Sequence, residues 1–370
     1  MVAALEIRPV LLAAGGTGGH LFPAFALAEE LTRRGRTVDL VTDERGDRYN
    51  TGFPGRTIHQ VPSATLAGRS PLAVVGTVAT LGRGIFRARS LLRRLRPLVV
   101  VGFGGYPTFP PLVAACLAGI PSLIHEQNAI MGRANRMLVG RVTALGASWG
   151  ETKNVPETAL HKVRVTGNPV RDAVIAAAGR PYPALAENTP VQLVVFGGSQ
   201  GARYFSDTVP PALTLLPEIL RRRLRVVQQC RQEDMARVRA AYATAGITAE
   251  LAAFFGDLPE RMAAAHLVIA RSGASSVSEL AVLGRPSILV PLPYSLDSDQ
   301  LNNACRLAQA GGAWCIEQKD LTPARLASEI AALVDSPDRL ASAAQAATSV
   351  GKPEAVRLLA DLVEELAGAG

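Results

Sequence analysis

The sequence predicts an α/β protein made of two domains, each built on a parallel β-sheet. Two observations carry this prediction: an apolar run ends in a glycine-rich turn twice, and helical spacing of apolar residues follows each turn. The chain has 370 residues, which is more than one hydrophobic core usually organises. The apolar runs are residues 10–14 and 191–196, and the turns are residues 15–20 and 197–202.

The two turns predict sites for negatively charged groups. A strand that stops at glycines and restarts as a helix brings backbone N–H groups and the positive helix end to one point, which favours a phosphate or a developing negative charge. Two such turns predict two nucleotide-type folds that face one cleft. The turns read Gly15-Gly16-Thr17-Gly18-Gly19-His20 and Gly197-Gly198-Ser199-Gln200-Gly201-Ala202.

The first half of the chain alternates short apolar runs with amphipathic ones, the order expected of strand–helix–strand units with parallel pairing. The helix after the first turn should stop at Gly35, behind two arginines. Residues 97–124 carry no charged side chain, but their five prolines disfavour a membrane-spanning helix. We expect a strand, a loop, a helix and a strand there. The predicted strands are residues 10–14, 38–42, 98–101 and 122–126.

The second half repeats this plan. A Gly-Asn-Pro segment at residues 167–169 is typical of a hinge between domains. We expect a first domain at residues 1–168 and a second at residues 169–353, with a final helix within residues 354–370 that can pack on either domain, including back on the first. The predicted strands are residues 191–196, 225–229, 267–270, 287–290 and 313–317, and the clearest helix covers residues 276–283.

The charge of the chain is concentrated in its first half. The formal net charge is +8, and no acidic residue lies between Asp47 and Glu126, whereas nine arginines do. Such basicity attracts nucleic acid or an anionic membrane surface. Nucleic acid is disfavoured, because only 5% of the residues are aromatic and few stacking platforms are available.

The cysteines predict neither a zinc site nor a disulfide framework. None of the four belongs to a Cys-x-x-Cys pair, and a chain of this length does not depend on disulfides. A reduced, cytoplasmic setting follows. The cysteines are Cys116, Cys230, Cys305 and Cys315.

His20 ends the first turn and has two interpretations. It is either a helix-cap or core histidine, or a general base, since a neutral imidazole suits proton removal near pH 7. The turn itself lacks the third glycine of the dinucleotide fingerprint, which would fall at Leu21. An oxidoreductase is therefore disfavoured.

Two further polar segments follow predicted strands of the first domain. Gly104, Gly105 and Tyr106 follow one strand, and His125 and Glu126 end the next. Because ligands bind at the carboxyl ends of strands in open parallel sheets, both segments are candidates for the site. A buried His-Glu pair can equally be structural.

The second domain offers two comparable segments. Ser276-x-x-Glu279 is either a capping box at a helix start, with Ser275 or Ser276 as the cap, or it places the Glu279 carboxylate on a ribose diol. The polar cluster at residues 297–304 either grips sugar hydroxyls or is only a solvated helix start.

Taken together, these segments are far more specific than any one alone. The chain resembles the MurG family, inverting transferases that add N-acetylglucosamine (GlcNAc) to lipid I and so make lipid II for peptidoglycan. The resemblance covers nearly the whole chain. It is carried, in this order, by Gly-Gly-Thr-Gly-Gly-His, Gly-Gly-Tyr, His-Glu-Gln-Asn, Gly-Asn-Pro-Val-Arg, Gly-Gly-Ser-Gln-Gly-Ala and Arg-Ser-Gly-Ala with Ser-Glu-Leu.

The resemblance implies a glycosyltransferase B fold, which is two Rossmann-like domains facing a cleft, with UDP-GlcNAc bound mainly to the second. Ser199 would hold the diphosphate, Phe255 would offer backbone contacts to uracil, and Glu279 and Gln300 would take ribose and GlcNAc hydroxyls. Gly104, Gly105 and Tyr106 would lie on the acceptor side. The positions matching the family's donor contacts are Thr17, Gly18, Gly19, Asn128, Arg171, Ser199, Phe255, Ala274, Ser275, Ser276, Val277, Ser278, Glu279 and Gln300.

Two segments depart from the family's usual pattern. Asp299 stands where the family usually has histidine, and this difference would alter the contacts to the sugar. Gln229-Cys230-Arg231 stands where the family often has Gln-Thr-Gly, which bears on a loop near the nucleotide.

The implied reaction inverts the anomeric carbon in a single displacement, so a base must take the acceptor proton and the departing diphosphate must be stabilised. His20 is our first candidate for the base, and His125 with Glu126 is the rival. Helix N-termini and amides can stabilise the diphosphate, so no metal or other cofactor is expected. Asp297-Ser298-Asp299 has the spelling of a metal motif but matches the family's sugar-reading segment.

The implied acceptor is a lipid, so the resemblance places the enzyme peripherally on the cytoplasmic face of the bacterial membrane. Apolar and arginine residues within residues 66–96 fit an anionic surface, or else an ordinary packed helix. Cell-wall synthesis proteins are further implied partners, with roles in cell shape and division. The alternatives are a related transferase with another lipid acceptor, such as diacylglycerol, and a nucleotide-sugar-binding module without catalysis.

Overall fold

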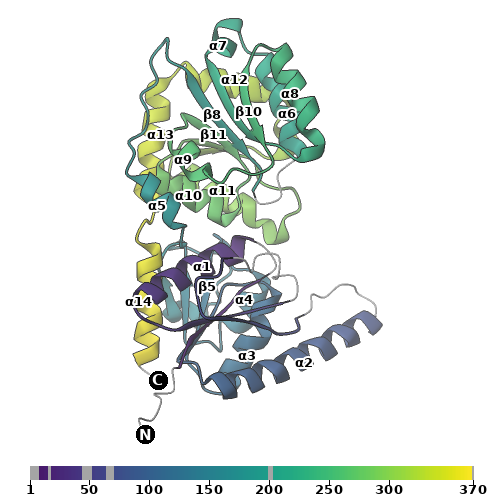
Figure 1. Ribbon diagram of the computed structural model, residues 1–370, viewed down its shortest axis with the longest axis vertical. Helices are drawn as coiled ribbons and strands as arrows, with labels where there is room; N and C mark the ends of the chain where they lie inside the picture. The colour runs from purple at the N-terminus through teal and green to yellow at the C-terminus, as the bar shows by residue number, and fades with distance from the viewer. Residues whose placement is uncertain (1–7, 16–17, 44–51, 64–70, 199–202, 369–370) are drawn as a thin grey trace. The chain divides into compact units, whose positions relative to one another are not determined.

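The computed structural model of the chain describes all residues except 1–7, 16–17, 44–51, 64–70, 199–202 and 369–370. Contacts between residues divide the chain into two compact units (Figure 1). Unit 1 comprises Met1–Arg171 and Pro353–Gly370, and unit 2 comprises Asp172–Lys352.

Unit 1 is built on a parallel sheet in which β1 is central. Over the described residues the strand order is β3-β2-β1-β4-β5-β6-β7, and Leu11 of β1 pairs with Asp39 on one side and Val100 on the other. The order reverses between β1 and β4, and ligands of open parallel sheets bind at such a point. The strands are β1 (Val10–Ala13), β2 (Val38–Thr42), β3 (Thr57–Gln60), β4 (Val99–Gly102), β5 (Ser122–Glu126), β6 (Ala144–Ala147) and β7 (Val163–Val165).

Helices cover both faces of this sheet, as the alternating side chains of its strands require. Val10 and Leu12 of β1 pack with α1 and α14 on one face, whereas Leu11 packs with α2, α3 and α4 on the other. The helices are α1 (Gly18–Arg33), α2 (Pro71–Leu95), α3 (Phe109–Leu117), α4 (Arg133–Leu138) and α14 (Ala355–Gly368), with short 3-10 turns η2 (Tyr106–Thr108) and η3 (Glu157–Lys162).

The last helix, α14, belongs to unit 1 although it follows unit 2 in the sequence. Leu359 and Val363 are buried against the same apolar cluster as α1. At the rim, Arg34 forms ion pairs with Asp361 at 2.6 Å and Glu364 at 2.9 Å. Because exposed ion pairs contribute little, the buried leucine and valine side chains account for most of the docking energy.

Unit 2 is a second parallel sheet with the order β10-β9-β8-β11-β12-β13 over the described residues. Helices α6, α8 and α12 share one apolar cluster with β8, while α5, α9, α10 and α13 pack against one another. The strands are β8 (Val191–Phe196), β9 (Leu224–Gln229), β10 (Thr248–Ala252), β11 (Leu267–Ala270), β12 (Ser287–Leu289) and β13 (Ala313–Cys315). The helices are α5 (Asp172–Ala178), α6 (Arg203–Thr214), α7 (Glu218–Arg223), α8 (Met235–Thr244), α9 (Leu258–Ala263), α10 (Ala274–Leu283), α11 (Asp299–Gln309), α12 (Pro323–Val334) and α13 (Pro337–Val350), with 3-10 turns η4 (Gln232–Asp234), η5 (Leu296–Ser298) and η6 (Gln318–Asp320).

The nine strands predicted from the sequence all form, with ends shifted by no more than two residues. The uncharged stretch at residues 97–124 forms β4, α3 and β5, as predicted, and no described helix is long and apolar enough to cross a membrane. Four strands, β3, β6, β7 and β10, were not predicted. The first, third and fourth are half-exposed edge strands with weak apolar patterns, and β6 consists of alanine, leucine and glycine.

Candidate functional site

The first glycine turn lies at the carboxyl end of β1, where two loops meet. A Cβ atom at Gly15 would lie 2.9 Å from both Pro107 Cγ and Thr42 Oγ1, so the close approach of neighbouring segments requires glycine there. Of the predicted contacts in this turn, Thr17 lies outside the described residues, Gly18 is buried at the start of α1, and Gly19 is exposed.

The His20 side chain lies against the loop that follows β4. It is half-buried in the first turn of α1, as predicted for a residue at a helix start. A Cβ at Gly104 would lie 3.4 Å from His20 Cδ2 and Nε2, and one at Gly105 would lie 3.5 Å from Cε1 and Nδ1. Both glycines have positive φ values, +85° and +74°, so the imidazole rests on backbone that only glycine easily provides. The structure thus joins His20 to the predicted acceptor segment, where Tyr106 opens η2.

His125 is fully buried at the end of β5, and both of its ring nitrogens form hydrogen bonds within the protein. Its Nε2 lies 2.9 Å from the Gly167 carbonyl oxygen, which can only accept, so the ring carries its proton on Nε2. Gln127 Nε2 donates to Nδ1 at 3.1 Å. Burial lowers the pKa of His125 to about 4, and the ring is neutral at neutral pH. Its bonds hold the Gly-Asn-Pro segment against β5.

The buried His125 predicts a loss of stability at acid pH. Its pKa lies near 6.5 in the unfolded chain and at about 4 in the folded one, so only the unfolded chain binds a proton between these values. We expect the contribution of neutral His125 to the free energy of unfolding to be complete above pH 6.5. It should fall by about 3 kcal/mol as the pH drops to about 4. Urea unfolding at pH 7 and pH 4 measures the loss, which should be smaller in His125→Phe and unchanged in a variant of the exposed His161. Equal losses in all three proteins would contradict the assignment.

Glu126 is also fully buried, and four N–H groups donate to its carboxylate. Asn128 donates from its backbone N and from Nδ2 to Oε1, at 3.0 and 3.1 Å. Gly132 N and Asn135 Nδ2 donate to Oε2, at 2.9 and 2.7 Å. Burial raises the pKa of Glu126, while these four bonds favour its ionised form. The carboxylate therefore orients Asn128 and the start of α4.

The remaining donor candidates of unit 1 lie close to these groups. Asn128 is half-buried and held by Glu126. The Arg171 guanidinium lies over the Phe22 ring, 5.5 Å from its centroid, and Phe22 packs against Gly18. Arg171 is thereby placed beside the first turn of α1.

In unit 2 the second glycine turn follows β8 in the same way. Gly197 and Gly198 are half-buried, and Gly198 has a positive φ of +85°. Ser199, the predicted diphosphate contact, lies outside the described residues, and α6 begins at Arg203.

Helix α10 begins earlier than the sequence suggested, and this corrects one prediction. Gly273 is its N-cap, and no side chain caps it, so Ser275 and Ser276 are not the cap and Ser276-x-x-Glu279 is not a capping box. Glu279 is 5% exposed in the second turn of the helix. The donor candidates here are half-buried Ala274, Ser275, Ser276 and Ser278, with Val277 and Glu279 buried.

The starts of α10 and α11 are joined by side-chain hydrogen bonds. Ser272 Oγ donates to the Gln300 carbonyl at 2.8 Å, and Asn303 Nδ2 donates to the Ser272 carbonyl at 3.2 Å. Gln300 Oε1 in turn accepts from Leu292 N at 3.0 Å. Asp299 Oδ1 accepts from Gln300 N at 2.7 Å and so holds the start of α11.

Phe255 can present only its backbone to a ligand. Its ring is buried, and the Arg261 guanidinium covers it at 4.6 Å from the centroid. Arg261 is itself paired with Glu250 and Asp257.

Three residues that position the site were not among the predicted site residues. Asn135 holds Glu126, nine residues away, and nothing in the sequence signals this. Buried Arg271 donates to the carbonyls of Val290 and Pro291, and Gln229 accepts from Gly197 N. The signal for the last two was present, because both stand where a parallel strand ends. Across the described ranges, no three histidine, cysteine, aspartate or glutamate residues group as a metal site would require.

Comparisons with known proteins identify the family. Residues 10–146 match the glycosyltransferase family 28 N-terminal domain, and residues 192–359 match its C-terminal domain. The chain is 53% identical over 358 residues to a protein of Mesorhizobium japonicum named UDP-N-acetylglucosamine--N-acetylmuramyl-(pentapeptide) pyrophosphoryl-undecaprenol N-acetylglucosamine transferase, covering 97% of this chain and 95% of that one. A protein of the same name from Rhizobium rhizogenes is 54% identical over 361 residues, with the same coverage.

A solved structure gives the same result. The crystal structure of Acinetobacter baumannii MurG superposes with a TM-score of 0.80 at 29% identity, covering 97% of this chain and 99% of that one. The two parallel-sheet units have the glycosyltransferase B fold that the resemblance implied. The chain belongs to glycosyltransferase family 28.

Proposed function

We propose that the chain transfers GlcNAc from UDP-GlcNAc to the 4-hydroxyl of the MurNAc unit of lipid I, an undecaprenyl-pyrophosphoryl MurNAc-pentapeptide, and so forms lipid II. The observation that carries this proposal is identity above 50% over 97% of the chain to proteins named for this transfer. The donor link is α and the product link β, so one displacement inverts the anomeric carbon.

The donor binds to unit 2 in this proposal. Ser199 and neighbouring amides hold the diphosphate, and the backbone at Phe255 meets uracil. The buried Glu279 carboxylate accepts from the ribose hydroxyls, and the Gln300 side-chain amide reads the GlcNAc hydroxyls. The bonds between Ser272, Gln300 and Asn303 support this division, because they fix the two helix starts that carry these groups.

The acceptor side belongs to unit 1. As the acceptor 4-oxygen attacks C1 of GlcNAc, His20 takes its proton, the C1–oxygen bond to UDP breaks, and the pair of electrons leaves with the diphosphate. The amides after β8 and the helix that follows stabilise that charge, so no metal or other cofactor enters the proposed step. His20 is favoured by its half-buried ring on the Gly104–Gly105 backbone.

His125 and Glu126 act as positioning residues in this scheme. Both side chains are buried. The ring nitrogens of His125 and the carboxylate oxygens of Glu126 form hydrogen bonds with other groups of unit 1. Glu126 sets Asn128, which contacts the donor in this scheme, and His125 holds Gly167.

The test uses labelled UDP-GlcNAc with a lipid I analogue. We expect transfer of label to lipid II, and little transfer from UDP-GalNAc, whose 4-hydroxyl is inverted. A parallel assay with diacylglycerol tests the alternative lipid acceptor. Label transferred only to diacylglycerol, or donor binding without transfer to any acceptor, would contradict the proposal.

The enzyme works at the cytoplasmic face of the membrane, held there by α2. One face of this helix packs on α3 through Ala88, Leu91 and Leu92. Its other side presents Val78, 62% exposed, and Phe86, 75% exposed. The same helix carries exposed arginines at positions 83, 87, 93 and 94. An apolar surface flanked by arginines suits anionic lipid, and cell-wall synthesis proteins would meet the enzyme there.

Phe86→Asp should weaken binding to anionic vesicles. Removing one large inserted side chain lowers the partition coefficient about tenfold or more. Co-sedimentation with phosphatidylglycerol vesicles at low salt measures it. The matched control is Ile219→Asp on α7, where an apolar side chain is 80% exposed in unit 2. Equal retention of Phe86→Asp and the wild type would argue against α2 as the membrane surface.

A further inference from the structure

The side chain of Gln229 bridges two loops that carry donor contacts. Gln229 ends β9 and is 9% exposed. Its Oε1 accepts from Gly197 N at 3.2 Å, at the start of the second glycine turn. Its Nε2 donates to the Ala253 carbonyl at 3.2 Å, two residues before Phe255. One amide therefore connects two segments. The first is the second glycine turn at residues 197–202, called the diphosphate turn below, and the second is the loop at residues 253–257 that carries Phe255, called the nucleobase loop.

The sheet order explains why a single side chain can do this. β9 lies between β8 and β10, so the two loops leave the sheet on either side of Gln229. The backbone ladder ends here with Cys230 N donating to the Ala252 carbonyl at 2.9 Å. The Gln229 amide therefore joins the two loops at the level where this ladder ends.

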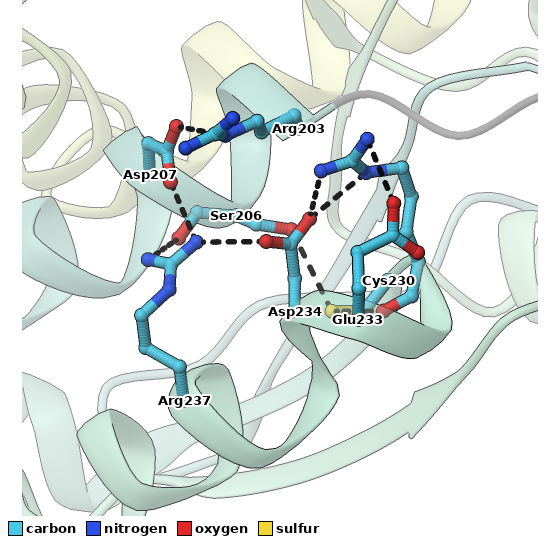
Figure 2. Close-up of polar contacts among 8 residues, drawn as sticks. Arg203, Ser206, Asp207, Cys230, Glu233, Asp234 and Arg237 are labelled. Carbon is cyan, nitrogen blue, oxygen red and sulfur yellow. Dashed lines mark hydrogen bonds and ion pairs between the residues drawn. The ribbon is translucent and has the colours of Figure 1, made fainter.

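The residues after Gln229 fasten the far side of the turn as well (Figure 2). Cys230 Sγ lies 3.5 Å from Ser206 Oγ on α6, the helix that follows the turn. Arg237 Nη2 pairs with Asp234 Oδ1 at 3.1 Å and with Asp207 Oδ1 at 2.6 Å.

Two further arginines, Arg231 and Arg203, form ion pairs with Asp234 and Asp207. Arg231 donates to Asp234 Oδ2 from Nε at 2.9 Å and from Nη2 at 2.8 Å. Arg203 is the first residue of α6, and its Nε lies 3.4 Å from Asp207 Oδ2. Segment 229–234 thus attaches to Gly197 before the turn and to α6 after it.

We propose that Gln229 is a positioning residue that fixes the spacing between the diphosphate turn and the nucleobase loop, with Cys230 to Asp234 holding the other flank of the turn. This inference rests on the proposed function, since it assumes UDP-GlcNAc as the donor. Gln229 acts through Gly197 and Ala253 rather than by touching the donor.

The decisive readout compares two ligands. UDP must fit both loops at once, whereas uridine needs only the nucleobase loop. A fixed spacing therefore favours UDP over uridine, and its loss should reduce that preference. A role in stability alone would weaken both ligands equally or neither.

The variant is Gln229→Met, which keeps the length of the side chain and removes both hydrogen bonds. The matched control is Gln228→Met on the same strand. Gln228 is buried and accepts a hydrogen bond from the Tyr242 hydroxyl, and it makes neither of the two bonds by which Gln229 joins the loops. Competition against labelled UDP-GlcNAc gives both dissociation constants in the full-length protein. With two hydrogen bonds lost, we expect the uridine-to-UDP ratio of dissociation constants to fall about tenfold in Gln229→Met and to stay unchanged in Gln228→Met.

Two results would overturn the inference: an unchanged ratio in Gln229→Met, or an equal fall in both variants. Wild-type protein that binds UDP and transfers GlcNAc keeps the proposed function whatever this ratio does. Wild-type protein that binds neither ligand removes the proposed function, and the inference with it.

Discussion

His20→Ala is expected to lower kcat about 10³-fold, the range that removal of a general base produces, while UDP binding stays within about threefold of the wild type. In the proposed mechanism the imidazole takes the acceptor proton only as the new bond forms. Its half-buried ring rests on the Gly104–Gly105 backbone in unit 1, whereas the proposed uracil and ribose contacts, Phe255 and Glu279, belong to unit 2.

The measurement is steady-state turnover with a lipid I analogue, together with direct titration of UDP. His161→Ala is the matched control, because His161 is an exposed histidine of the same unit. Near-normal turnover in His20→Ala would remove the base assignment. Loss of UDP binding together with turnover would instead make His20 a donor contact.

Much of the fold was accessible from the sequence because strong apolar runs stop at glycine or at polar residues. β1, β5 and β8 are buried strands bounded by turn residues, and their positions were predicted within one residue. By contrast, β7 is a three-residue edge strand whose side chains are half-buried or exposed, and its existence depends on pairing with β6. Local pattern cannot anticipate a strand that only its neighbour stabilises.

The site shows the same division between local and long-range effects. The positions of His20 and His125 at the carboxyl ends of strands follow from the order of elements. Their different surroundings do not. The bond from His125 to Gly167 joins residues 42 apart, and Asn135 on α4 reaches Glu126 at the end of β5. The sequence therefore left two candidate bases, and the structure shows that they differ in burial: His125 is fully buried and His20 half-buried.

The start of α10 shows how a local signal can mislead. Ser276-x-x-Glu279 has the spelling of a capping box, but the helix begins two residues earlier, with Gly273 as its N-cap. The turn after β11 sets that start, and Glu279 is consequently buried in the second turn. A carboxylate buried there does not cap the helix, and its contact with ribose hydroxyls stays a prediction.

Glu126→Gln is expected to lower the free energy of unfolding by about 3 kcal/mol or more, because a buried donor left without an acceptor costs roughly 1–3 kcal/mol. Each carboxylate oxygen accepts two N–H groups. An amide in its place directs its own N–H groups at two of these donors, whichever way it is turned. Urea unfolding at neutral pH measures the loss.

Glu364→Gln provides the matched control for this variant. Its carboxylate is partly exposed in unit 1 and pairs with Arg34 and Arg36, so its loss should cost no more than about 1 kcal/mol. Turnover per folded molecule distinguishes the two roles of Glu126. A positioning residue acts through Asn128, so we expect a rise in the UDP-GlcNAc KM and a far smaller change in kcat than in His20→Ala. Wild-type stability combined with abolished turnover would make Glu126 a catalytic residue, because a carboxylate held only for structure cannot be lost without a cost to folding.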